Sequence, residues 1–208
     1  MKILLVNGSP RINGCTNRAL LEICNELNKY HIHTTIIWIG QNPLHCCNCR
    51  YCKKAGFCKN DDVVNELVDK IKSHDGIIFG SPVYYGGITS QLTAVLTRLF
   101  YSNPKILERK PVAGVFSSRR AGSTSAMSQF NLFFLMHNCN IIGSQYWNEV
   151  HGDFPNEVEL DIEGLQTMRT LAKNMINALG YDTCEYEKKI HMNFISREYL
   201  KLLKNNKY

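Results

Sequence analysis

Apolar and polar positions along the chain follow two alternating patterns, which predict strands followed by helices. Short apolar runs that end in glycine or serine indicate buried strands, and apolar residues every three or four positions indicate amphipathic helices. Strands are predicted at 2–10 with its closing turn, 33–40, 76–82, 111–118 and 140–144. Helices are predicted at 16–30, from Asp61 or Asp62 to about His74, at 89–100, 123–137 and 162–178.

Five strands that alternate with five helices predict a parallel sheet with helices on both faces. The expected fold class is α/β, a flavodoxin-like three-layer sandwich whose five-stranded sheet has the order 2-1-3-4-5. No repeat or linker divides the chain, so we expect a single domain over 1–208 with a C-terminal arm at about 185–208. In this order the loops after the first, third and fourth strands are neighbours, and the search for a site begins there.

Composition and charge narrow the function classes. The net charge is +6, from 24 Lys and Arg against 18 Asp and Glu, and half of this excess falls in 185–208. Such a diffuse charge without a binding motif argues against a nucleic-acid partner. The longest apolar run, 132–136, is too short to span a membrane, and no secretory signal is visible. We therefore expect a cytoplasmic protein, in which nine cysteines favour metal or redox chemistry over disulfides.

The loop after the first strand, 8–18 (GSPRINGCTNR), has the features of an anion site. The hydroxyls of Ser9 and Thr16, the guanidinium of Arg11 and the N–H groups of a helix N-terminus converge there. The loop lacks the Walker A ending and the GxGxxG fingerprint, so a terminal monophosphate fits better than a pyrophosphate. An ordinary polar loop with Thr16 as the helix N-cap is the alternative.

The loop after the third strand, 80–92 (GSPVYYGGITSQL), combines an apolar, aromatic stretch with Gly86 and Gly87. A flat heteroaromatic ring needs such an apolar wall, and glycines allow the backbone to approach it closely. The tyrosines could instead pack under a turn or at a subunit interface.

The loop after the fourth strand, 117–124 (SSRRAGST), places Arg119 and Arg120 at a strand end. The two arginines could contact the pyrimidine edge of a flavin or the phosphates of a nicotinamide nucleotide. A solvated basic turn is the alternative, and the spacing does not choose between these.

Together the three loops resemble those of the NADPH-dependent FMN reductase family. GSPRINGCTN looks like its FMN-phosphate loop with Cys15 in place of the usual Asn, SPVYYGGIT looks like its isoalloxazine loop, and SSRRAGS looks like its third flavin-edge loop. The resemblance implies FMN as cofactor, NAD(P)H as co-substrate and no catalytic side chain. The implied cofactor-binding residues are Ser9, Arg11, Asn13, Cys15, Thr16, Asn17, Pro82, Val83, Tyr84, Tyr85, Gly86, Ser117, Arg119, Arg120 and Gly122.

Five cysteines are concentrated in the loop at 45–60, between the second strand and the next helix. Such a connection usually has 2–6 residues, so one of about twenty needs either an internal support or a function. Four thiolates can organise a loop around iron and sulfide, and four thiolates can also hold zinc. A redox dithiol, or a metal-free loop folded over the flavin or against a partner subunit, remain alternatives.

The cysteine spacing also resembles that of the iron–sulfur flavoprotein subgroup, whose motif is Cx2Cx2C with a fourth cysteine about five residues on. Cys46, Cys49, Cys52 and Cys58 match it with gaps of two, two and five residues. The resemblance implies a [4Fe–4S] cluster on these four side chains, although Cys47 is a fifth thiol that competes for the site.

The sequence therefore predicts an FMN-dependent NAD(P)H oxidoreductase that passes hydride to FMN and then electrons to a small acceptor or an iron–sulfur cluster. The alternatives are an iron–sulfur flavoprotein that carries electrons from ferredoxin, and a flavodoxin-like binding protein with a zinc-held loop. The resemblance also implies a homodimer or higher homo-oligomer. Six aromatic residues could supply the apolar surface that such an interface buries, although each could equally belong to the core: Tyr84, Tyr85, Phe130, Phe133, Phe134 and Trp147.

Overall fold

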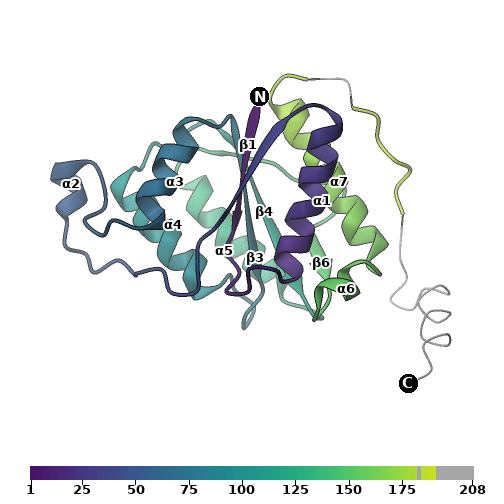
Figure 1. The fold of residues 1–208 in the computed structure, drawn as a ribbon, viewed down its shortest axis with the longest axis horizontal. Helices are drawn as coiled ribbons and strands as arrows, with labels where there is room; N and C mark the ends of the chain where they lie inside the picture. Colours follow the sequence, from purple (N-terminus) through teal and green to yellow (C-terminus); the bar gives the residue numbers. More distant parts are fainter. Residues whose placement is uncertain (182–183, 191–208) are drawn as a thin grey trace.

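The centre of the structure is a parallel sheet between two layers of helices (Figure 1). This computed structural model describes residues 1–181 and 184–190. Its main strands are β1 (Lys2–Asn7), β2 (His33–Trp38), β3 (Gly76–Pro82), β4 (Pro111–Ser118) and β5 (Asn140–Ile141). They pair in the order β2-β1-β3-β4-β5, which confirms the predicted fold class and strand order.

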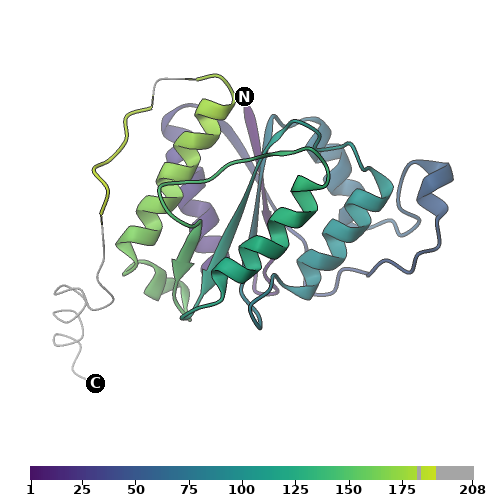
Figure 2. The ribbon, with the colours of Figure 1, turned by 180° about the vertical axis from the view of Figure 1, so that it is seen from behind.

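The helices cover the sheet because side chains alternate between its two faces. Ile3 and Leu5 of β1 pack toward α1 (Cys15–Lys29) and α7 (Ile162–Ala178). Leu4 and Val6 pack on the other face, whose covering helices are α3 (Val63–Lys72), α4 (Ser90–Ser102) and α5 (Ser123–Leu135). Figure 2 shows the molecule from behind, with α5 in front of the sheet.

The predicted helices end within two residues of the observed ones, because their apolar faces and caps are local signals. Asp62 is the N-cap of α3, and its carboxylate accepts a hydrogen bond from the N–H of Val64 at 3.1 Å. The sequence had left open whether Asp61 or Asp62 caps this helix, and the structure selects Asp62.

The fifth strand position differs from the prediction. β5 has only two residues, beside Pro111 and Val112 of β4, and the predicted strand to 144 is therefore too long. A sixth strand, β6 (Glu149–His151), pairs with β4 at Phe116–Ser118. Two short strands thus share one edge of β4, and a three-residue strand is too short for its pattern to be recognised in a sequence.

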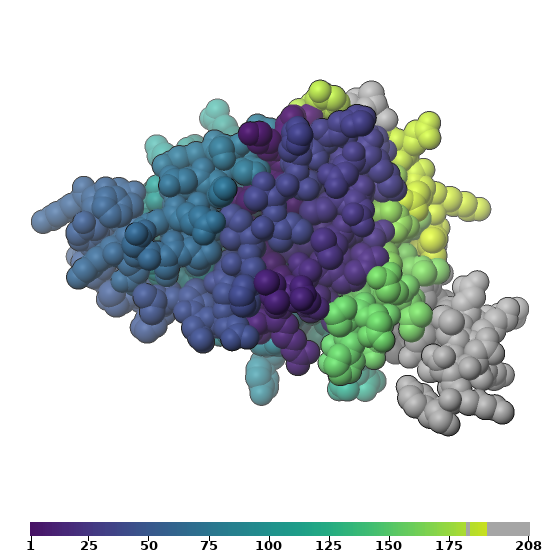
Figure 3. Space-filling view, viewed as in Figure 1, coloured from purple at the N-terminus to yellow at the C-terminus, as the bar shows by residue number. Residues whose placement is uncertain are grey.

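Two short helices were also not predicted, α2 (Tyr51–Ala55) within the cysteine loop and α6 (Pro155–Val158) before α7. In the space-filling view the segment around α2 projects from one side of the molecule (Figure 3). None of the helices that the structure describes is both long and apolar enough to cross a bilayer.

The first part of the predicted C-terminal arm docks on α7. Nε of Arg169 donates to Glu187 Oε1 at 2.7 Å, and the N–H of Ile190 donates to Gln166 Oε1 at 2.7 Å. The remainder of that arm, 191–208, lies outside the described residues.

Candidate functional site

The loops after β1, β3 and β4 meet at the carboxyl edge of the sheet, and hydrogen bonds join them. The N–H of Gly8 donates to the carbonyl of Gly80 at 2.8 Å, and the N–H of Val83 donates to the carbonyl of Ser117 at 2.8 Å. The hydroxyls of Thr16 and Ser117 lie 2.8 Å apart. The structure thus brings together the three segments that the sequence singled out.

The N-terminus of α1 is open toward this edge. Its N-cap is Gly14, which has no side chain to accept a hydrogen bond from the first turn. The N–H groups of the first turn also lack partners within the helix, so those of residues 15–17 can bind an anion. Thr16 lies inside the helix, so the alternative in which it serves as N-cap is wrong.

The shape of this loop is fixed from within. The N–H of Ser9 donates to Asn7 Oδ1 at 3.0 Å, and the N–H of Arg11 donates to Ser9 Oγ at 3.1 Å. Trp38 Nε1 donates to the carbonyl of Ser9 at 2.7 Å, which ties the loop to the end of β2. A loop held in this way is preorganised for a ligand instead of being ordered by it.

The predicted phosphate-binding residues differ in exposure. Ser9 and Thr16 are buried, whereas Arg11 and Asn13 are exposed and Asn17 is half-buried. The Ser9 hydroxyl accepts from a backbone N–H, so its own proton is free to be donated elsewhere. The backbone and the Arg11 guanidinium therefore offer the most accessible donors, and the two hydroxyls lie behind them.

Cys15 occupies the first position of α1 and is half-buried. Its thiol donates to the carbonyl of Gly152 at 3.4 Å, just beyond β6. Burial raises the pKa of this thiol, so it stays neutral near pH 7. A neutral side chain does not repel an anion at the helix N-terminus, and the cysteine is compatible with the predicted role of this loop.

The second loop ends in a tight turn over Tyr84–Gly87. Tyr84 and Gly87 exchange two backbone hydrogen bonds of 3.0 Å, and φ is 52° at Tyr85 and 75° at Gly86. Positive φ at both central residues is typical of a type I′ turn, which a tyrosine adopts at a cost. The Tyr85 side chain is fully exposed and Tyr84 is about half exposed, with Pro82 and Val83 half-buried below them.

The third loop packs against the second through Gly122. This glycine has φ of 100°, and a Cβ on it would lie 3.1 Å from Val83 Cγ1 and 3.2 Å from Gly86 Cα. It is also the N-cap of α5 and leaves that helix without a side-chain cap. Arg119 and Arg120 are exposed at the tip of the loop.

A polar cluster next to the third loop was missed by the sequence reasoning. His151 Nδ1 lies 3.2 Å from the hydroxyl of Ser118, which accepts a hydrogen bond from Ser123 Oγ at 3.1 Å. His151 Nε2 lies 3.8 Å from Glu149 Oε1, and this contact raises the pKa of the imidazole. The polar–apolar–polar pattern of β6 was the one available signal.

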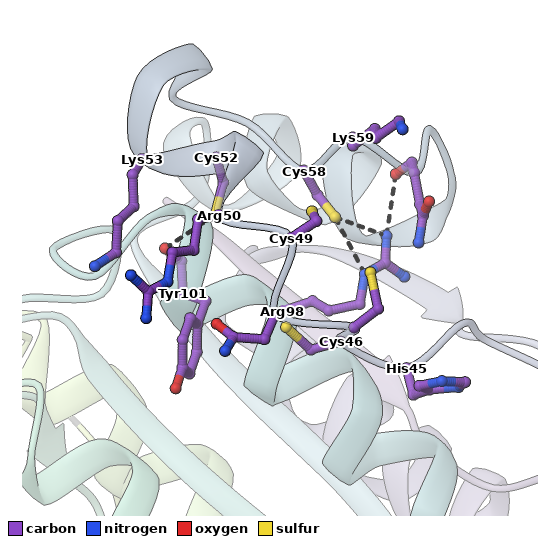
Figure 4. A pocket seen from close by; sticks show the side chains of 13 residues that line it. His45, Cys46, Cys49, Arg50, Cys52, Lys53, Cys58, Lys59, Arg98 and Tyr101 are labelled. Carbon is purple, nitrogen blue, oxygen red and sulfur yellow. Dashed lines mark hydrogen bonds between the residues drawn. The ribbon is translucent and has the colours of Figure 1, made fainter.

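The five clustered cysteines line one cavity of about 140 Å³ beside α4 (Figure 4). None of the nine cysteines, all of which lie within the described residues, is in a disulfide. Within the described residues no three His, Cys, Asp or Glu side chains are arranged as a metal site. The chain therefore gathers the thiols without drawing their sulfur atoms to a common point.

The donors around this cavity suit a soft metal centre. They are five thiols and the imidazole of His45, with no carboxylate among the lining residues, which disfavours magnesium and calcium. The cavity is also lined by the basic side chains of Arg50, Lys53, Lys59 and Arg98. Positive charge around the thiols would stabilise an anionic group such as an iron–sulfur cluster or tetrathiolate zinc, so the residues present fit either centre.

Helix α4 connects the cavity to the three loops. Its N-cap Thr89 donates to the carbonyl of Gly8, at 2.8 Å. Arg98 lies nine residues further on, about 14 Å along the helix axis. The cysteine cavity is therefore separate from the strand-end loops of the same chain but lies on a rigid element that begins at them.

Comparison with known proteins is consistent with this geometry. The profile of a family described as NADPH-dependent FMN reductase matches residues 1–153. An iron–sulfur flavoprotein of Methanocaldococcus jannaschii is 34% identical over 184 residues, which cover 84% of this chain and 95% of that protein. A second iron–sulfur flavoprotein of the same organism is 28% identical over 81% of this chain and 92% of its own length.

The fold is also found among solved structures. A flavodoxin from the domain Archaea superimposes with a TM-score of 0.58 at 15% identity, over 87% of this chain and the whole of that one. At this identity the likeness establishes the flavodoxin-like fold alone.

Proposed function

The chain belongs to the NADPH-dependent FMN reductase family, and on this premise we propose that it is a redox protein carrying FMN in the strand-end loops and an iron–sulfur cluster in the cysteine loop. The observation that carries the FMN part is the open N-terminus of α1, enclosed by three loops that hydrogen bonds join. The cysteine cavity and the relatives named iron–sulfur flavoproteins support the cluster.

In this proposal the first loop binds the FMN phosphate. The N–H groups of residues 15–17 donate to it, Arg11 neutralises its charge, and Ser9, Asn13 and Thr16 complete the cradle. Residues Pro82–Gly86 would hold the isoalloxazine, and Ser117, Arg119, Arg120 and Gly122 would supply donors to the far edge of the ring. When bound, FMN accepts a hydride from a nicotinamide and releases electrons singly or in pairs.

The cluster in this proposal is held by Cys46, Cys49, Cys52 and Cys58, leaving Cys47 outside the ligand set. An iron–sulfur cluster supplies one-electron exchange with FMN or with a partner protein. The basic side chains of Arg50, Lys53 and Lys59 offset its negative charge at the surface. The homo-oligomer, the cytoplasmic location and the identity of the electron acceptor remain predictions.

Anaerobic purification followed by quantitation tests the proposal. We expect one FMN and about four iron and four acid-labile sulfide per chain, as a single cubane cluster requires. A yellow protein without iron would leave a flavin-only reductase, and stoichiometric zinc with little flavin would favour the binding protein. A colourless protein that also fails to bind added FMN would overturn the proposal.

Two electron sources remain for this redox protein. The family description favours NAD(P)H, whereas the proposed iron–sulfur cluster would accept electrons one at a time from a protein donor such as ferredoxin. Anaerobic mixing separates them, because NADPH bleaches the flavin absorbance of a nicotinamide-driven reductase within its turnover time. If NADPH and NADH leave the flavin oxidised while reduced ferredoxin bleaches it, the protein is an electron carrier.

A further inference from the structure

Arg98, on the inward face of α4, is almost completely buried, with 2% of its surface exposed. An arginine in such a position must have partners for its charge and for its five N–H groups. Among the described residues, the hydrogen-bond partners of its guanidinium all lie in the cysteine loop or at its ends (Figure 4).

The guanidinium closes the cysteine loop. Nη1 donates to the carbonyl of Leu44 at 3.1 Å, before the first clustered cysteine, and Nη2 donates to the carbonyl of Asn60 at 3.0 Å, after the last. Nη1 and Nη2 form a bidentate pair with the carboxylate of Asp62 at 2.6 and 2.8 Å. One side chain thus holds together two ends of a loop that are sixteen residues apart.

The same guanidinium also contacts one of the clustered thiols directly. Nε and Nη2 lie 3.2 and 3.1 Å from Sγ of Cys58, so this sulfur is approached by two cationic donors. The situation of Cys52 is the opposite, since its Sγ lies 3.5 Å from the carbonyl of Tyr101, an acceptor. Cys58 is therefore held in the position of a hydrogen-bond acceptor.

We propose that Arg98 is a positioning residue of the iron–sulfur site, which fixes Cys58 as a ligand and makes the cluster easier to reduce through two N–H···S hydrogen bonds. This inference rests on the proposed function, because it requires a cluster in the cysteine loop. Hydrogen bonds to ligand sulfur withdraw charge from it and favour the reduced, more negative cluster.

The charges around Cys58 predict the direction in which substitutions shift the reduction equilibrium of the cluster. Asp62 compensates the charge of Arg98 in the free protein, and its Oδ1 also caps α3. Removing the guanidinium fork takes donors away from the sulfur, whereas neutralising Asp62 leaves the donors and uncovers their positive charge. The two changes should therefore move the reduction equilibrium of the cluster in opposite directions.

The experiment compares anaerobically purified wild-type protein with the variants Arg98→Lys and Asp62→Asn. Lysine keeps the charge but lacks the planar fork, and asparagine remains a good N-cap for α3. Iron and sulfide per chain are measured first, and the cluster is then titrated with redox dyes. We expect Arg98→Lys to shift the reduction equilibrium about tenfold toward the oxidised cluster, about 59 mV for one electron. Asp62→Asn should shift it toward the reduced form.

A matched control separates this role from a loss of stability. Lys173 on α7 is also buried and lies 3.3 Å from Glu26, on the opposite face of the sheet. Lys173→Met breaks that pair without touching the cysteine loop, so it should destabilise the fold and leave the cluster potential unchanged.

The outcomes separate the presence of a cluster from the role of Arg98. Wild-type protein without a cluster after reconstitution would overturn the cluster part of the proposed function and this inference together. A cluster whose potential is unchanged in Arg98→Lys, or shifts in the same direction in Asp62→Asn, would overturn the inference alone. If Arg98→Lys loses its iron, the Asp62→Asn shift toward reduction decides the matter, and its absence overturns the inference.

Discussion

The side-chain oxygens of Thr16 and Ser117 lie 2.8 Å apart, although 101 residues separate them in the chain. Thr16 is in the first turn of α1 and Ser117 is near the end of β4, and both are buried. This hydrogen bond ties the proposed phosphate loop, 8–18, to the loop proposed to contact the far edge of the flavin ring. The two loops of the proposed FMN site are therefore held at a set distance before any ligand binds.

The first prediction concerns the hydroxyls of the phosphate loop. We expect Ser9→Ala combined with Thr16→Ala to weaken FMN binding about tenfold to a hundredfold, because hydrogen bonds to a charged group each contribute about 1.5–3 kcal/mol and part of this is recovered by water. Fluorescence quenching gives the affinity for FMN and, in parallel, for riboflavin, which has no phosphate.

The comparison between the two flavins serves as the internal reference for this prediction. Riboflavin affinity should fall less than FMN affinity, because the Thr16–Ser117 hydrogen bond is lost for both ligands whereas phosphate contacts are lost for FMN alone. Ser128→Ala, which removes an exposed hydroxyl on α5 that donates to the carbonyl of Thr124, should change neither affinity. Equal losses for both flavins would mean that the hydroxyls shape the loop and do not bind phosphate.

The second prediction concerns the contact between the second and third loops. Gly122→Ala places a methyl group against Val83 and Gly86 at a φ of 100°, so the loops must separate. We expect a loss of about 1–3 kcal/mol in the free energy of unfolding and at least tenfold weaker FMN binding. Gly143→Ala is the control, because a Cβ there meets no atom within 4 Å. If FMN affinity is unchanged in Gly122→Ala, the contact between these two loops does not shape the FMN site.

The third prediction concerns Tyr85, whose side chain is fully exposed and whose φ is 52°. Glycine relieves the strain and removes no packing, so Tyr85→Gly should leave the free energy of unfolding unchanged or raise it by up to about 1 kcal/mol. If the ring covers bound FMN, affinity for FMN should fall at the same time. Arg109→Gly tests the same backbone change at φ of 61° away from the loops, and it should not alter FMN binding. A Tyr85→Gly protein that binds FMN normally would remove the tyrosine from the site.

The sequence was sufficient for the layers and for the place where the loops meet, because both follow from the order of strands and helices. β3 and β4 were predicted with the residues that they have, and Ser9, Val83 and Ser117 do lie on joined loops. Arg98 was not recognised, because its partners Cys58 and Asp62 precede it by 40 and 36 residues and leave no periodic signal. From the sequence, α4 was predicted only as an amphipathic helix.

The aromatic residues illustrate the same limit. Phe130 and Phe134 are fully buried against Phe79, whereas Tyr84 and Trp147 are about half exposed and Tyr85 is fully exposed. All of these are aromatic rings in or near helices and turns, so residue type alone could not show which are buried and which are exposed. The division depends on which side of a helix faces the sheet and on how the turn after β3 is folded.

The fourth prediction concerns the pH dependence of stability near β6. The His151 imidazole contacts Glu149 and the hydroxyl of Ser118. The carboxylate of Asp161 is also near, because its Oδ2 accepts a hydrogen bond from the backbone N–H of His151 at 2.7 Å. The contact with the Glu149 carboxylate raises the pKa of His151 above its ordinary value near 6.5. The stabilisation of the folded state by protonated His151 is therefore complete below about pH 6.5, and it is lost as the pH rises through the raised pKa.

Urea unfolding at a series of pH values between 5.5 and about 8.5 measures this effect. We expect the free energy of unfolding to fall across the range in wild-type protein and to fall less in His151→Asn. Burial also raises the pKa of Asp161, but this carboxyl is present in both proteins, so the comparison with His151→Asn isolates the histidine. His33→Asn changes an exposed histidine of β2 and should keep the wild-type profile. Identical profiles for wild type and His151→Asn would mean that the Glu149 contact does not form in solution.

The last prediction concerns which thiols hold the proposed cluster. Cys58 is approached by two guanidinium N–H groups, and Cys47 lines the same cavity but lies outside the Cx2Cx2C spacing. Serine is a poor ligand for iron compared with thiolate, so Cys58→Ser should reduce iron well below about four per chain, whereas Cys47→Ser should retain it. Iron and acid-labile sulfide assays after anaerobic reconstitution provide the measurement.

Cys139→Ser is the control for the loss of any cysteine. Burial raises the pKa of Cys139 to about 11, and its thiol does not line the cavity, so this variant should keep its full iron content. If Cys47→Ser loses iron while Cys58→Ser keeps it, Cys47 is a ligand of the cluster and Cys58, which follows Cys52 after a gap of five residues, is not. Arg98 would then close the loop around a thiol that stays free, and its two N–H groups would have no influence on the metal.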